Sequence, residues 1–174
     1  AKDRRQRQMC IRDRIIGYLL KKNIMENIIQ SFSLNGKRSL VTGASKGIGA
    51  STAQILAEAG SDVVITGRDL EGLKETQENI ESLGRKCLVI EADLSLENEA
   101  NKVADKALGV FGTIDILVNN AGTALLENIL STSNEDWDKV QSVNLKTPFI
   151  LAKLLAPNMI CLLYTSPSPR DCKT

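Results

Sequence analysis

Residues 41–49 read V-T-G-A-S-K-G-I-G, and this stretch decides the fold of the chain. The short apolar run that leads into it, Ser39 to Thr42, predicts a buried strand, and the residues after it have the apolar spacing of a helix. A glycine-rich turn between a strand and a helix is suited to binding phosphate, because the helix N-terminus presents free N–H groups and a positive dipole. The stretch therefore predicts the opening unit of a nucleotide-binding α/β fold.

Each glycine of this turn has a physical role. Gly43 permits the tight turn, Gly47 lets the backbone approach a pyrophosphate without a Cβ, and Gly49 lets the helix pack close to the strand. The other candidates for cofactor binding in the turn are Ser45, Lys46 and Ile48. The alternative is a tight structural turn without a ligand, which three glycines together with a hydroxyl group and a lysine do not favour.

Strands and helices alternate along the rest of the chain. Further strands are predicted at residues 63–65, 87–90 and 114–118. The predicted helices, with their caps, are 48–59, 70–83 behind Asp69, 96–111 behind Ser95, and 133–155 behind Ser133. This alternation predicts an α/β fold with a doubly wound parallel sheet, covered by helices on both faces and ending after about four strands.

Two local features of these helices are predicted as well. In the first helix, the apolar residues Ile48, Ile55, Leu56 and Ala59 follow helical spacing. In the last helix, Pro148 has no N–H to donate to the preceding turn, which predicts a kink near Asn144.

Composition excludes several classes of function. The chain has 174 residues, of which 43% are hydrophobic and 25% charged, which is typical of a globular domain. It has no histidine, which excludes Ser-His-Asp catalysis and His-ligated zinc, and no metal site is predicted. Aromatic residues make up only 3%, and no apolar run reaches the length of a membrane span. Neither nucleic acid nor a membrane is therefore an expected partner.

The two ends of the chain differ from its middle. Residues 1–14 carry six positive and two negative charges. A DNA sequence that can encode residues 161–166 has a reverse complement that contains a sequence able to encode residues 9–13. Both sequences resemble the adapters used in sequencing libraries. The domains are therefore interpreted as adapter or upstream sequence at 1–24, a nucleotide-binding domain at 25–160 and an adapter-encoded tail at 161–174. The alternative is a real basic arm and a real linker rich in serine and proline.

Cysteine usage indicates a reducing compartment. Cys10, Cys161 and Cys172 fall in the two tails, and only Cys87 lies in the body of the chain. One cysteine forms no disulfide framework, so a cytoplasmic location is expected. Cys87 is interpreted as a small core residue rather than a nucleophile.

Three further segments carry a family resemblance. They are Glu91-Ala92-Asp93-Leu94, Asn119-Asn120-Ala121-Gly122 and Val143-Asn144-Leu145. Together with the G-x-x-x-G-x-G turn, and in the same order, they resemble the short-chain dehydrogenase/reductase family over residues 34–160, which implies a Rossmann sheet.

The resemblance also implies roles for these residues. Asp93 and Leu94 would contact the adenine of a dinucleotide, and Asn120, Ala121 and Gly122 would lie beside the cofactor ribose. Asn144 would belong to the catalytic residues by opening its helix and holding a water molecule in a proton relay.

The end of the second strand bears on the choice of cofactor. NAD enzymes usually place a carboxylate there to bind the ribose 2′-OH, whereas this strand continues into Gly67 and Arg68. Arg68 can fork onto a 2′-phosphate, and Lys46 can add a second positive charge. NADP is therefore favoured over NAD, and Asp69 is interpreted as a helix cap. The alternative for Arg68 is a solvated charge at the start of a helix.

The family's chemistry also needs a serine after a fifth strand and a Tyr-x-x-x-Lys on the next helix. That pattern occurs once, as Tyr18 with Lys22 upstream of the first strand, where it is interpreted as chance. The resemblance implies a full-length NADP(H)-dependent oxidoreductase that acts on a small alcohol or ketone, such as a sugar or a 3-oxoacyl compound, and forms homo-oligomers. The chain itself is expected to be inactive. The alternatives are a nucleotide-binding protein without catalysis and a non-functional fragment.

Overall fold

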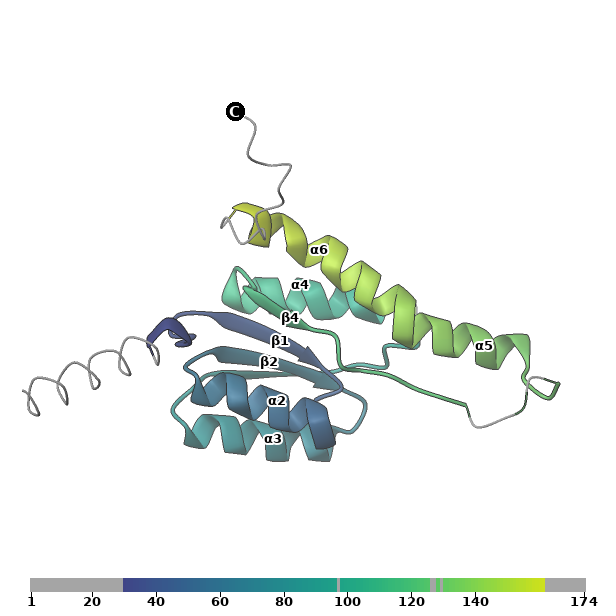
Figure 1. Cartoon of the computed structure of the whole chain (residues 1–174), viewed down its shortest axis with the longest axis horizontal. Coiled ribbons are helices and arrows are strands. Elements are labelled where there is room, and N and C mark those ends of the chain that lie inside the picture. Colours follow the sequence, from purple (N-terminus) through teal and green to yellow (C-terminus); the bar gives the residue numbers. More distant parts are fainter. Residues whose placement is uncertain (1–29, 97, 126–127, 129, 162–174) are drawn as a thin grey trace, which may run out of the picture. The chain divides into compact units, whose positions relative to one another are not determined.

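The computed structural model describes residues 30–96, 98–125, 128 and 130–161 (Figure 1). The chain divides into two units, residues 1–33 and residues 34–174, and every strand and helix named below belongs to the second. The segment 1–24 with its Tyr18–Lys22 pair, and the tail from residue 162 onward, lie outside the described residues. The interpretation of both tails as adapter-encoded sequence therefore stays a prediction.

Four parallel strands form one sheet in the order β3-β2-β1-β4. They are β1 (Arg38–Thr42), β2 (Asp62–Gly67), β3 (Cys87–Glu91) and β4 (Ile116–Val118). Leu40 of β1 lies opposite Val64 of β2 and Leu117 of β4. The order reverses at β1, with β2 on one side and β4 on the other. The four predicted strands and their doubly wound parallel arrangement are confirmed.

Helices cover both faces of the sheet (Figure 1). One face carries α2 (Gly47–Glu58) and α3 (Leu70–Ser82), and the other carries α4 (Glu99–Phe111) and α6 (Thr147–Cys161). Before α6 come α5 (Asn134–Gln141) and a π-helical turn, η1 (Ser142–Lys146), which run into it without a break. Side chains alternate between the faces of β1, so Leu40 joins the apolar cluster with α4 and α6, and Val41 joins the cluster with α2 and α3.

The first helix forms as predicted and Leu56 packs against the core, but two of its apolar residues face outward. Ile48 and Ile55 are 80% and 63% exposed, whereas the buried residues of α2 are Gly49, Ala53 and Ala57. A Cβ at Gly49 would collide with the carbonyl oxygen of Gly43, so α2 lies too close to the strand for a large side chain to fit between them. The helix therefore packs through its smallest residues and turns its isoleucines outward.

Two of the three predicted helix caps are confirmed. Asp69 caps α3 by accepting a hydrogen bond from the N–H of Gly72, and Ser133 caps α5 by accepting one from the N–H of Asp136. The Ser95 cap is wrong, because α4 begins at Glu99 and Ser95 donates to the carboxylate of Asp93 instead. A serine hydroxyl can bond to several nearby groups, and the Ser95 hydroxyl bonds to the Asp93 carboxylate rather than to a helix N–H.

The disturbance predicted at Pro148 takes the form of the π-helical turn η1. Pro148 has no N–H with which to bond the carbonyl of Asn144, and the N–H of Thr147 bonds the carbonyl of Ser142, five residues back. The helix therefore widens by one residue around Asn144.

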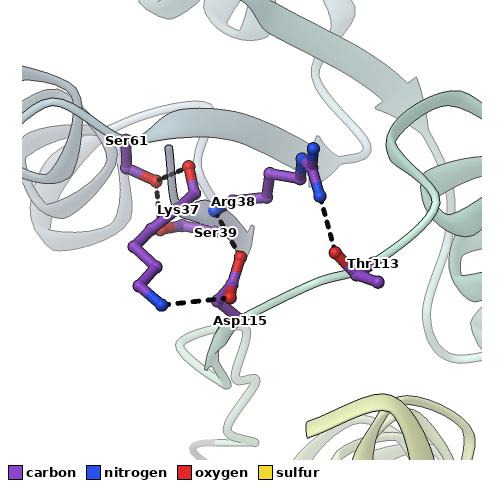
Figure 2. Close-up of polar contacts among 6 residues, drawn as sticks. All are labelled: Lys37, Arg38, Ser39, Ser61, Thr113 and Asp115. Carbon is purple, nitrogen blue, oxygen red and sulfur yellow. Dashed lines mark hydrogen bonds and ion pairs between the residues drawn. The ribbon is translucent and has the colours of Figure 1, made fainter. Parts of the chain in front are cut away.

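Polar contacts join the amino ends of the strands (Figure 2). The glycine turn lies at the carboxyl end of β1, the other end of the sheet. The backbone N–H of Arg38 donates to the carboxylate of Asp115 at 2.9 Å, and its guanidinium donates to the hydroxyl of Thr113 at 2.7 Å. The hydroxyls of Ser39 and Ser61 lie 2.7 Å apart and join β1 to the start of β2. The first strand is thus held at its base to both of its neighbours.

No helix in the part of the chain that the structure describes is long and apolar enough to cross a membrane. Within the same residues, no group of three or more acidic or cysteine side chains is arranged to hold a metal ion.

Candidate functional site

The turn between β1 and α2 needs glycine at three positions for three different reasons. Gly43 has a φ of +67°, and a Cβ there would lie 2.9 Å from the Cα of Ala121. Gly47 has a φ of +61°, but a Cβ there would meet no protein atom within 4 Å. Gly49 is required by the close approach of α2 to the turn, as described above. Open space above Gly47 is what the close approach of a ligand requires.

The N-terminus of α2 is free to receive an anion. Its N-cap residue, Lys46, makes no side-chain hydrogen bond to the helix, and there is no acidic residue in the first turn. The first N–H groups of a helix need partners from outside it, and together with the helix dipole they attract phosphate. The turn and this helix end therefore fit a phosphate group.

A cleft of about 440 Å³ opens beside this turn, at the carboxyl ends of the strands. It brings together most of the predicted site residues, namely Gly43, Ser45, Lys46, Arg68, Asp93, Leu94, Asn120, Ala121 and Gly122. Four predicted residues do not line it: Gly47, Ile48 and Gly49 lie at the start of α2, and Asn144 lies in η1. The cleft lies where the strand order reverses, which is where open α/β sheets bind ligands.

Thr42 and Asn120 join the glycine turn to the loop after β4. The Thr42 hydroxyl accepts hydrogen bonds from the N–H groups of Asn120 (3.1 Å) and Ala121 (2.9 Å). In return, the Asn120 side-chain amide donates to the carbonyls of Thr42 (2.9 Å) and Gly43 (3.1 Å). Sequence analysis did not single out Thr42; the available signal was a pair of polar residues that end two strands predicted to lie in one sheet.

Asp93 is, with Asp69, one of the acidic residues that line the cleft. Its carboxylate accepts hydrogen bonds from the Ser95 N–H (3.0 Å) and hydroxyl (2.8 Å). Burial raises the pKa of Asp93, but the hydrogen bonds from Ser95 and the charges of Arg68 and Lys139 outweigh it, so the pKa lies below its ordinary value. The carboxylate is therefore ionised and held in place at neutral pH.

Lys139 is a site residue that sequence analysis missed. It lies on α5, lines the same cleft, and is one of the two cations whose charge acts on Asp93. Its signal in the sequence was its position one helical turn before Val143, which also lines the cleft.

Asn144 clamps the far side of the loop after β4. Its side-chain oxygen accepts a hydrogen bond from the N–H of Thr123 (2.9 Å), and its side-chain nitrogen donates to the carbonyl of the same residue (2.8 Å). Both functions of the amide are used on one residue of the cleft wall. Asn144 therefore supports Thr123, a residue that lines the cleft, from the π-helical turn without lining the cleft itself.

Comparisons with known proteins agree with this geometry. Residues 37–165 match the sequence model of a protein family described as short chain dehydrogenase. The chain is similar to 2-dehydro-3-deoxy-D-gluconate 5-dehydrogenase of Escherichia coli, with 41% identity over 133 residues that cover 76% of this chain and 52% of that protein. It is also similar to the rhamnolipids biosynthesis 3-oxoacyl-(acyl-carrier-protein) reductase of Pseudomonas aeruginosa, with 40% identity over 126 residues that cover 72% of this chain and 49% of that protein.

Among solved structures, the chain resembles a metagenomic short-chain oxidoreductase in complex with NADP. The TM-score is 0.71 at 38% identity, and the likeness covers 74% of this chain and 59% of that one. The chain spans about half the length of the curated relatives it matches.

Proposed function

Because the chain belongs to the short-chain dehydrogenase/reductase family, we propose that it forms the cofactor-binding half of an NADP(H)-dependent oxidoreductase that interconverts alcohols and carbonyl compounds. The observation that carries this proposal is the cleft at the carboxyl ends of the strands, where a glycine turn and an uncapped helix end lie beside Lys46 and Arg68. When bound there, NADP(H) would supply or accept the redox equivalent of the reaction.

The preference for NADP rests on the charges at the end of β2. Arg68 follows the strand and lines the cleft together with Lys46. The acidic residue that directly follows it in the chain, Asp69, has a carboxylate oxygen bonded to the N–H of Gly72 as the cap of α3. A guanidinium and an ammonium suit a 2′-phosphate, and a carboxylate already used as a helix cap is poorly suited to bind a ribose hydroxyl. The solved relative bound to NADP supports the same choice.

The remaining roles divide along the cleft. We propose that the start of α2, with Gly47, Ile48 and Gly49, receives the pyrophosphate, since its N–H groups are free of side-chain caps. Asp93 and Leu94 would hold the adenine, and the backbone of Asn120 to Gly122 would lie along the second ribose. Asn144 would act in proton transfer through its π-helical turn while its side chain holds Thr123 in place.

We also propose that this chain binds cofactor without completing the reaction. The serine and the Tyr-x-x-x-Lys of the family have no counterpart in residues 34–160, and the chain spans about half of its relatives. The names of those relatives support a sugar acid or a 3-oxoacyl compound as the substrate of the whole protein. The exposed Leu145 and Phe149, one helical turn apart, support a homo-oligomer, and the free Cys87 thiol supports a cytoplasmic setting.

The absence of a Tyr-x-x-x-Lys from residues 34–160 favours a second candidate, a protein that binds a nucleotide and catalyses no reaction even at full length. The two candidates agree on the cleft and differ in whether the rest of the parent protein supplies the catalytic groups. Assay of the full-length parent with NADPH and a panel of carbonyl compounds distinguishes them, because only the first candidate predicts turnover.

Cofactor binding is tested by titrating the 174-residue chain with NADPH and following the dihydronicotinamide fluorescence. Gly47→Ala is expected to weaken NADPH binding, because a methyl group would occupy the space left open for the ligand. Gly84→Ala is the matched control, since Gly84 also has a positive φ (+74°) and no protein atom near its Cβ position but lies after the C-terminus of α3 rather than at the start of α2. Equal effects of the two changes would contradict the proposed site. A chain that aggregates and binds no nucleotide would favour the non-functional fragment, and oxidation of NADPH by this chain would contradict its proposed incompleteness.

A further inference from the structure

We propose that Gly72 and Thr76, on the first two turns of α3, are positioning residues that set the preference of the site for a 2′-phosphate. Neither residue lines the cleft, and neither bears a charge. Their contacts place the turn that carries Ser45 and Lys46 relative to Arg68. This inference rests on the proposed function and adds to it the part of the protein that keeps those groups in register.

Thr76 ties the glycine turn to α3. Its hydroxyl is buried and lies 3.0 Å from the carbonyl oxygen of Ala44 and 3.0 Å from that of Gly72, so it donates its single proton between them. The N–H of Ala44 donates in turn to the carbonyl of Thr66 on β2 at 3.1 Å. Ala44 is therefore fixed through its N–H to the sheet and through its carbonyl to α3, directly before Ser45.

Gly72 lets the same turn rest on the helix backbone. A Cβ at Gly72 would lie 2.5 Å from the carbonyl oxygen of Ser45 and 3.2 Å from its Cβ. The first of these atoms belongs to the backbone, so it can move only if the turn moves. Any side chain at position 72 would therefore push Ser45, and Lys46 after it, away from α3.

The first turn of α3 also determines where Arg68 lies. Asp69 caps the helix through the N–H of Gly72 at 3.1 Å, and Arg68 is the residue directly before that cap. Gly72 thus contacts the glycine turn at Ser45, and through the Asp69 cap it contacts the residue that directly follows Arg68. A change at Gly72 alters the separation of Lys46 and Arg68.

A 2′-phosphate is more sensitive to that separation than the rest of the cofactor. Charge-assisted hydrogen bonds depend on short distances and good alignment, and loss of one such bond weakens binding about tenfold or more. NADH lacks the 2′-phosphate, so its binding relies on the remaining contacts. The selective effect of the two residues is therefore visible as the ratio of the dissociation constants for NADH and NADPH.

The test compares four variants of the 174-residue chain by fluorescence titration with NADPH and with NADH. Gly72→Ala and Thr76→Val are each expected to lower the NADH-to-NADPH ratio of dissociation constants about tenfold, chiefly by weakening NADPH. Thr76→Ser keeps the hydroxyl and should keep the ratio. The control, Gly109→Ala, also replaces a helical glycine, and its Cβ would meet no atom within 4 Å.

The outcomes distinguish a failure of the proposed cofactor preference from a failure of the positioning role of Gly72 and Thr76. A wild-type chain that binds NADH as tightly as NADPH would contradict the proposed cofactor, whatever the variants do. A wild-type preference for NADPH that survives unchanged in Gly72→Ala and Thr76→Val would overturn this inference alone. A general structural role would weaken both nucleotides equally and leave the ratio unchanged. If Gly72→Ala does not fold, the Thr76→Val and Thr76→Ser pair decides.

Discussion

Thr42 and Asn120 are bonded to each other twice, although they lie 78 residues apart in the sequence. The N–H of Asn120 donates to the Thr42 hydroxyl at 3.1 Å, and the Asn120 side-chain amide donates to the Thr42 carbonyl at 2.9 Å. The first residue ends β1, and the second follows β4. These two hydrogen bonds therefore hold the glycine turn and the loop after β4 in a fixed position relative to each other.

Thr42→Val should destabilise the chain. The change keeps the shape of the side chain but leaves the N–H groups of Asn120 and Ala121 without their acceptor, which costs about 1–3 kcal/mol of the free energy of unfolding. Urea denaturation measures it. Thr52→Val is the matched control, because the Thr52 hydroxyl bonds only to a carbonyl of its own helix. A loss at Thr42 no larger than that at Thr52 would show that this hydroxyl does not join the two segments.

Gly49→Ala should be among the most damaging single methyl additions in the described part of the chain. The new Cβ would collide with the Gly43 carbonyl and the Asn120 side-chain amide, so α2 must move off the sheet, at a cost of about 1–3 kcal/mol or more. Gly109→Ala, in the open, should instead raise the free energy of unfolding by up to about 1 kcal/mol. Thermal melting of the two variants side by side checks the prediction, which fails if both are equally stable.

The ionised form of Asp93 should stabilise the fold at neutral pH. Since its pKa in the folded chain lies below the ordinary value for aspartate of about 3.9, this contribution is present above that value and is lost as pH falls toward the folded pKa. Asp93→Asn should therefore reduce stability at pH 7, and the difference from the wild type should shrink below about pH 4. Stability measured against pH tests this.

Ser95→Ala gives an independent reading of the same interaction. It removes the 2.8 Å hydrogen bond from the Ser95 hydroxyl while keeping the one from the backbone, so the pKa of Asp93 should rise toward its ordinary value. Carboxyl titration followed by NMR reports it. An unchanged Asp93 titration in this variant would contradict the assignment.

The Cys87 thiol should be inert in the folded chain. Burial, assisted by the charge of Glu81, raises its pKa to about 12, so almost no thiolate exists at pH 8. In a variant that carries Ser at positions 10, 161 and 172, reaction with a disulfide reagent should follow unfolding rather than precede it. Rapid labelling under native conditions, at the rate of a free thiol peptide, would show that Cys87 is accessible.

The order of strands and helices could be predicted because each element carries its own local signal. The strands at 63–65 and 87–90 are apolar runs bounded by turn residues, and the Asp69 and Ser133 caps lie where their helices begin. The turn at 43–49 was recognisable because its glycines lie between a predicted strand and a predicted helix. The segment at 120–122 was a candidate only through the family resemblance.

What could not be predicted depends on contacts between distant parts of the chain. Ile48 and Ile55 have helical spacing, yet the closeness allowed by Gly49 turns the other face of α2 inward. Lys139 lines the cleft from α5, and the Thr42 hydroxyl accepts a hydrogen bond from Asn120, which follows β4. Each of these pairings joins residues from different elements, so the periodicity of one element alone does not predict it.

The polar ties at the base of β1 have a consequence for the order of folding. Arg38 and Asp115 are 77 residues apart, whereas β1 and β2 are joined by a single short crossover, so closing the β1–β4 contact costs more chain entropy. We expect Asp115→Asn to change the unfolding rate with little effect on the folding rate, and Ile65→Val, in the core between β2 and α2, to slow folding. Stopped-flow kinetics distinguish the two, and equal effects on folding would contradict this order. The glycine turn would then form early in folding, and the loop after β4, on the other side of the cleft, would form late. The nucleotide site would therefore be complete only at the end of folding.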